Sequence, residues 1–77
     1  MSDRPATELE LEILRRHVRE GKSRVALQIS IIETLDEGNH IKAAALARRV
    51  LEAMRISLDM SKQHLLRIEL QSKSFPC

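Results

Sequence analysis

Apolar residues recur at alternating spacings of three and four along the second half of the chain, with one polar interruption, Ser61. Such a repeat is typical of a long helix that lies along another helix at a small crossing angle. We therefore expect a helix over about residues 40–71. Its buried seam would consist of Ala44, Ala47, Leu51, Met54, Leu58, Ser61, Leu65 and Ile68.

A matching stripe in the first half of the chain indicates a second long helix, over about residues 7–37. Thr7 and Glu10 have the spacing of a capping box, in which the threonine hydroxyl accepts a hydrogen bond from a first-turn amide. Glu8 and Glu10 also suit the positive end of a helix dipole. The apolar stripe consists of Leu11, Leu14, Val18, Gly21, Val25, Gln28 or Ile29, Ile32 and Leu35.

Gly21 leaves two architectures open. It could end a first short helix, with Ser23 capping the next, which would give a three-helix bundle. We favour a continuous helix, because the apolar stripe keeps its phase through Gly21 and one glycine inside a helix costs only about 1 kcal/mol relative to alanine. A ladder of charges of alternating sign also crosses this point at helical spacing; its members are Glu12, Arg16, Glu20 and Arg24.

The segment Glu37-Gly38-Asn39-His40 is the clearest break in both patterns. We expect Gly38 to adopt the left-handed conformation that follows many helix ends. Asn39 would then be the N-cap of the next helix. A connection this short requires antiparallel neighbours, so the chain is predicted to be all-α, an antiparallel helical hairpin.

Folding the chain at Gly38 brings the two seams into a definite register. Gly21 would lie opposite Leu58, leaving room for the larger side chain. Near the turn, Leu35 would approach Ile41. Such pairing of small with large residues is what a close-packed seam requires.

Size and composition support this architecture. The 77 residues form one domain, 1–77, with a short arm over 1–6 and a tail over 72–77, and they include a single aromatic residue. A chain this short lies near the lower limit for independent stability, and its one cysteine allows no internal disulfide. Association with a further chain is the remaining common remedy. Without a 20-residue apolar segment or an N-terminal leader, we expect a cytoplasmic protein and no membrane contact.

A second apolar stripe on the later helix exceeds what one hairpin can cover. None of its residues is Asp, Glu, Lys or Arg; they are Ala43, Leu46, Val50, Ala53, Ser57, Met60 and His64. Two hairpins packed face to face would bury it in a four-helix bundle, so a homodimer is expected. Alternatively, the first helix bends back at Gly21 and covers the stripe, or a larger protein partner does so. The candidate interface residues are Leu46, Val50, Ala53, Met60, Leu27 and Ile31.

Candidate chemistry is sparse. His17 and His64 should lie at the same end of the hairpin and could frame a metal or an acid–base pair, but two isolated histidines more often have an ordinary interfacial role. No serine, cysteine or carboxylate pair has the partners that catalysis requires. We therefore expect a protein that is not an enzyme, binds no cofactor, and acts by contact with other helices in an interaction or regulatory role.

The competing hypothesis is a nucleic-acid-binding regulator. Net charge is +2, and basic residues gather in two stretches, of which the second offers Arg48, Arg49 and Arg55 as candidate phosphate contacts. Acidic residues such as Glu52 and Asp59 interleave with these arginines at helical spacing, which is typical of an ordinary solvated surface. This pattern favours the interaction hypothesis.

Overall fold

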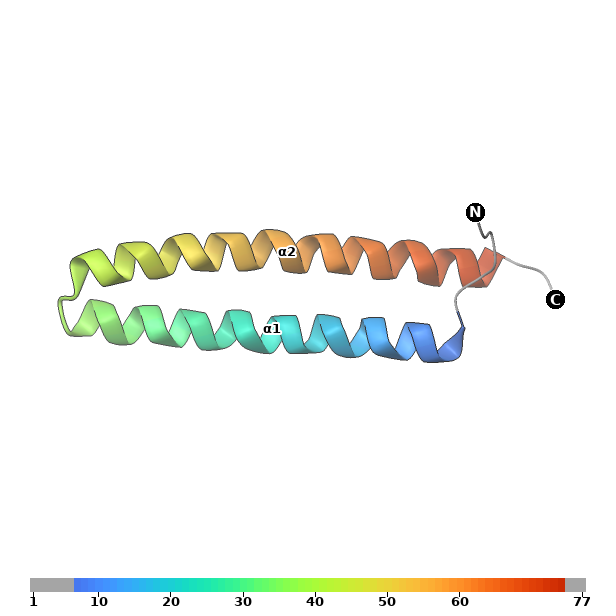
Figure 1. Cartoon of the computed structure of the whole chain (residues 1–77), viewed down its shortest axis with the longest axis horizontal. Coiled ribbons are helices and arrows are strands. Elements are labelled where there is room, and N and C mark those ends of the chain that lie inside the picture. The colour runs from blue at the N-terminus through green and yellow to red at the C-terminus, as the bar shows by residue number, and fades with distance from the viewer. Residues whose placement is uncertain (1–6, 75–77) are drawn as a thin grey trace.

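The computed structural model describes residues 7–74, with side chains through Gln71. Two long helices, α1 (Glu8–Glu37) and α2 (Ile41–Ser74), run antiparallel and pack side by side along their lengths, as Figure 1 shows. The molecule measures 58 × 19 × 16 Å. The predicted all-α helical hairpin is therefore confirmed, whereas the pairing of two hairpins into a four-helix bundle stays a prediction.

Helix α1 begins where the capping signal places it. Thr7 is the N-cap, and its Oγ1 accepts a hydrogen bond from the backbone N–H of Glu10 at 3.1 Å. Glu8 and Glu10 lie in the first turn, where their negative charge opposes the positive end of the helix dipole. The predicted start is thus correct to within one residue.

Helix α1 is continuous through Gly21, so the alternative three-helix bundle with a break at that residue is wrong. A Cβ atom built on Gly21 would lie only 2.9 Å from Cδ1 of Leu58. The glycine therefore gives Leu58 the space predicted for it. Packing between the two helices accounts for a glycine in the middle of a helix, where its intrinsic propensity is poor.

The turn differs from its predicted form by one residue. Gly38 has an ordinary φ of −88°, and it is Asn39 that adopts the left-handed conformation, with φ 59°. The N–H of Asn39 donates to the carbonyl of Asp36, and the N–H of His40 donates to that of Leu35. These two bonds form a Schellman motif, in which the left-handed residue follows the helix cap. The prediction of a left-handed Gly38 is therefore wrong.

Asn39 is not the N-cap of α2 either, because its role is to close α1. The carbonyl of His40 accepts the first backbone hydrogen bond of α2, from the N–H of Ala44, and the helix begins at Ile41 rather than at His40. Ile41 is 77% exposed, so it adds little to the buried seam, and the predicted approach of Leu35 to Ile41 stays a prediction.

The core is a single seam between the helices. Its buried residues all belong to the two predicted stripes, and Ile32, Ala47 and Leu51 form its central cluster near the turn. Gln28 is half-buried in the seam of α1, and its Nε2 donates to the backbone carbonyl of Ala47 at 2.9 Å. The buried side chains are Leu11, Val18, Ile32, Ala44, Ala47 and Leu51.

The far end of α2 extends beyond its predicted limit. The helix continues to Ser74, so the prediction that residues 72–77 form a tail is wrong for the first three of them. Residues 72–74 contain neither proline nor glycine, so their intrinsic propensities do not oppose a last helical turn. The predicted arm 1–6 and residues 75–77 lie outside the described part of the chain.

Candidate interaction surface

All six residues of the candidate interface lie at the surface of the hairpin. Met60, Leu27 and Leu46 are the most exposed of them, at 64%, 63% and 60%, and the smaller Ala53 is exposed as well. The side chains of Val50 and Ile31 are less exposed, at 45% and 42%. The hairpin by itself therefore leaves this apolar surface in contact with water.

These residues occupy one side of the molecule. Arg24 of α1 and Ser57 of α2 line the same hollow between the helices. Leu27 and Ile31 follow Arg24 at three and seven residues, and Ala53 and Val50 precede Ser57 at four and seven, so each pair continues its row along the same helix face. We call this surface the apolar side and define it as Leu27, Ile31, Leu46, Val50, Ala53 and Met60.

Ile13 extends the apolar side toward the start of α1, where it is 48% exposed. It lies two full heptads before Leu27 and therefore belongs to the same row of α1. The signal that could have identified it is this heptad spacing. Other large apolar residues are exposed outside the apolar side, namely Leu9, Ile41, Ile56, Leu66 and Leu70.

The opposite side of the hairpin is charged. Two ion pairs join the helices there: Arg15 Nε lies 3.1 Å from Glu69 Oε2, and Arg48 pairs with Asp36 close to the turn. Both pairs are partly exposed, so each contributes well under 1 kcal/mol to stability. We define the charged side as Arg15, Asp36, Arg48, Glu52, Arg55, Asp59, Lys62 and Glu69.

Two of the three candidate phosphate contacts lie together, because Arg48 and Arg55 line one hollow that also holds the carboxylates of Glu33 and Glu52. Arg48 forms an ion pair with Asp36. Arg55 shares a shallow groove with Glu52, Asp59 and Lys62, so carboxylates lie beside its positive charge. Arg49 follows Arg48 directly and therefore points about 100° further around the helix. Carboxylates therefore interleave with the positive charges of Arg48 and Arg55.

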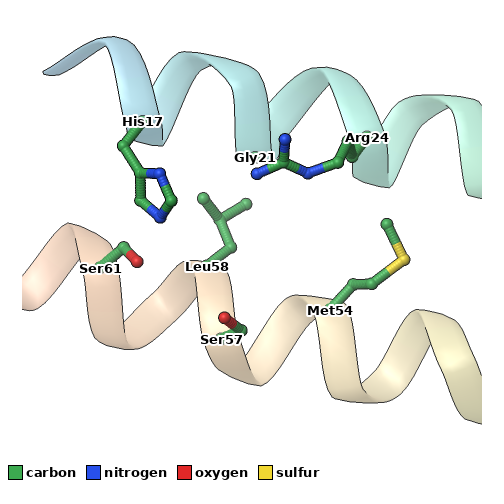
Figure 2. A pocket seen from close by; sticks show the side chains of 7 residues that line it. All are labelled: His17, Gly21, Arg24, Met54, Ser57, Leu58 and Ser61. Carbon is green, nitrogen blue, oxygen red and sulfur yellow. The ribbon is translucent and has the colours of Figure 1, made fainter. Parts of the chain in front are cut away.

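A small hollow of about 100 Å³ lies between the helices around Gly21 and Leu58. Figure 2 shows His17 reaching from α1 toward Ser61, while Arg24 extends back along α1 toward Gly21. His64 lies instead in the neighbouring groove, beside Leu14 and Met60. Within residues 7–71, no cluster of three or more His, Cys, Asp or Glu side chains is placed to bind a metal ion.

Neither α1 nor α2, over the part of the chain that the structure describes, is long and apolar enough to cross a membrane. No known protein family, curated protein or solved structure matches this chain.

Proposed function

We propose that this protein is a non-catalytic interaction protein that acts by helix–helix contact through its apolar side. The observation that carries the proposal is the contrast between the two sides of the rod. One side exposes more large apolar residues, such as Leu27, Leu46 and Met60, and the other carries both interhelical ion pairs and the interleaved charges around Arg55. Burial of apolar surface is the main favourable term in protein association, at roughly 25 cal/mol per Å².

The contact that we propose adds helices to the hairpin and completes a four-helix bundle. A second copy of the chain would do so as a homodimer, and helices of a larger protein would do so in a regulatory complex. The long, straight and unbroken helices favour such packing, because seams of this kind align along their whole length. We further propose that this takes place in the cytoplasm, where a small domain with a single cysteine and no disulfide is typical.

Leu46→Glu and Leu66→Glu form a matched pair of variants that test the proposal. Both leucines belong to α2 and are similarly exposed, at 60% and 55%, but only Leu46 belongs to the apolar side. A carboxylate at position 46 would have to be buried without a partner in the complex. Sedimentation at micromolar concentration, and capture of partner proteins from cells of the source, should show association lost in Leu46→Glu and retained in Leu66→Glu.

Equal behaviour of the two variants would contradict the proposal, because association would then not depend on the apolar side. Circular dichroism controls for folding, since both substitutions are at exposed helix positions and should preserve helicity.

A further inference from the structure

We infer that the apolar side is built to receive a second copy of this chain in an antiparallel arrangement, with the two turns at opposite ends and the twofold axis crossing the rod at Ser57. The inference rests on the proposed function and adds to it the identity and orientation of the partner. In this dimer α1 packs along α1 of the second copy, and α2 packs along α2.

The position of the axis follows from the register of the hairpin. Gly21 lies against Leu58, so in antiparallel helices the next residue toward the turn, Lys22, lies level with Ser57. These two residues are also at the middle of α1 (Glu8–Glu37) and α2 (Ile41–Ser74). A twofold axis at this level lets two hairpins overlap along their full length, which buries the largest area.

Charge complementarity selects the orientation. The middle of the α1 row holds Glu20 and Arg24, which lie two residues to either side of Lys22. A twofold axis at that level places Glu20 of each copy opposite Arg24 of the other, forming two equivalent ion pairs. In the described part of the chain, neither residue takes part in the two interhelical ion pairs, Arg15–Glu69 and Arg48–Asp36.

The facing surfaces of α2 also match. Its row from Ala43 to His64 carries no charged residue, so it packs on itself without burying an unpaired charge. Ser57, a small residue, lies on the axis where the helices approach closest. Ala53 lies four residues before the axis and Met60 three after it, so each small alanine faces the large methionine of the second copy.

The parallel arrangement, with both turns at the same end, lacks this complementarity. It would place Glu20 and Arg24 of α1 against the uncharged row of α2 in the second copy. Charged groups would then be partly desolvated without a partner, which disfavours association.

The exposed area of the single chain is sufficient for such a dimer. Its accessible surface is 6270 Å², whereas a compact monomer of 8.8 kDa would expose about 4800 Å². The excess is larger than the roughly 800 Å² per partner of a standard interface.

Cysteine cross-linking of the full chain tests the position of the axis. In a Cys77→Ser background, Ser57→Cys should form a disulfide-linked dimer under mild oxidation, because the two copies of position 57 meet at the axis. The matched control is Ala53→Cys, on the same row of α2. Its two copies would be displaced by about 12 Å along the rod, and a disulfide requires Cα atoms within about 7 Å.

Charge exchange tests the orientation independently. Glu20→Arg or Arg24→Glu alone should raise the dimer Kd about tenfold or more, because like charges then face each other twice in each dimer. The double variant, Glu20→Arg with Arg24→Glu, should restore a Kd close to that of the wild type.

The antiparallel arrangement would be overturned if the chain formed a dimer in which Ser57→Cys stayed unlinked, or in which Ala53→Cys formed the disulfide equally well. Neither result would contradict the proposed function. A chain that stays monomeric at every concentration would overturn the second copy as partner. The proposed function itself would fail only if the Leu46→Glu and Leu66→Glu variants also captured partners equally.

Discussion

Asn39 shows how one residue decides the geometry of the connection. Its φ of 59° lies in the region that side chains other than glycine, asparagine and aspartate rarely adopt. Asparagine tolerates this conformation, and the position after a helix cap is where it is found. Gly38, which needs no such freedom at φ −88°, could be replaced at lower cost.

Two substitutions at the turn distinguish these roles. Asn39→Ala should lower the free energy of unfolding by about 1 kcal/mol, because alanine is strained in the left-handed conformation. Asn39→Gly should leave it unchanged or raise it. The measurement is urea denaturation followed by circular dichroism at one fixed protein concentration.

Gly38→Ala is the matched control, and it should change the free energy of unfolding by no more than about 0.5 kcal/mol. A Cβ at this position would lie 2.8 Å from Cδ2 of His40, an exposed side chain that can turn away. A larger loss for Gly38→Ala than for Asn39→Ala would contradict the assignment of the left-handed residue.

Gly21 presents the opposite situation, because space rather than backbone conformation explains the glycine. Gly21→Ala should gain up to about 1 kcal/mol from helix propensity, but part of that gain should be lost because the added methyl group displaces Leu58. In a Leu58→Ala background the full gain should appear. Thermal unfolding of the four proteins in this double-mutant cycle measures the difference. An identical effect of Gly21→Ala in both backgrounds would mean that the two residues are not coupled.

At the scale of the helices, size matching and a hydrogen bond from Gln28 both favour the observed register of the seam. The side chain of Gln28 in α1 reaches the backbone of α2 through a 2.9 Å hydrogen bond to the carbonyl of Ala47. That carbonyl lies inside a helix, so the bond adds to the helical hydrogen bonding rather than replacing it. The hydrogen bond of the Gln28 amide forms only when the two stripes are correctly aligned, so it favours that alignment.

Gln28→Ala should therefore lower the free energy of unfolding by about 1 kcal/mol, the net value of a typical hydrogen bond. Gln63→Ala, at an exposed position of α2, is the control and should change it by less than about 0.5 kcal/mol. Chemical denaturation gives both values. Equal effects of the two substitutions would show that the contact between Gln28 and Ala47 does not stabilise the hairpin.

At the scale of the whole molecule, the hairpin is a thin rod. Its radius of gyration is 17.3 Å, whereas a compact domain of this length would have a value of about 11 Å. A rod of two helices has a seam but no enclosed core, which leaves much of its apolar surface exposed. Association with further helices would enclose this exposed apolar surface.

The melting temperature should accordingly depend on protein concentration. For an associating chain, mass action stabilises the folded state as concentration rises, and each tenfold increase should raise Tm by about 3–6 °C. Calorimetry or circular dichroism over a hundredfold concentration range measures the effect. A constant Tm would indicate that the hairpin unfolds as a monomer.

The pairing of charges on the surface of the molecule also bears on the nucleic-acid hypothesis. Because Arg48 is paired and Arg55 lies among carboxylates, we expect no mobility shift of duplex DNA or of RNA at low salt. Binding that weakens by roughly 0.9 log units per log unit of salt for each phosphate, and that is lost on joint replacement of Arg48, Arg49 and Arg55 by alanine, would favour the nucleic-acid hypothesis instead.

Much of the architecture could be predicted from the sequence because it depends on local periodicity. The stripes through Leu11 and Ala44 predicted both helices, the spacing of Thr7 and Glu10 predicted the start of α1, and the smallness of Gly21 predicted its contact with Leu58. The residues of the candidate interface are exposed outside the seam of the single hairpin, and their role as an interface stays a prediction.

Other features depend on contacts between residues far apart in the chain, and only the tertiary structure decided them. The sequence left a break at Gly21 open as an alternative, and the structure shows a continuous α1 in which Leu58 packs against the glycine. The ion pair between Arg15 and Glu69 joins residues that no local pattern connects. Which residue of the turn is left-handed depends on which carbonyls of α1 accept the last hydrogen bonds. Those carbonyls belong to Leu35 and Asp36, so the left-handed residue is Asn39 rather than Gly38. Periodicity thus determined the elements and their apolar stripes, whereas the closing bonds of the turn and the ion pairs between the helices depend on how the helices pack together.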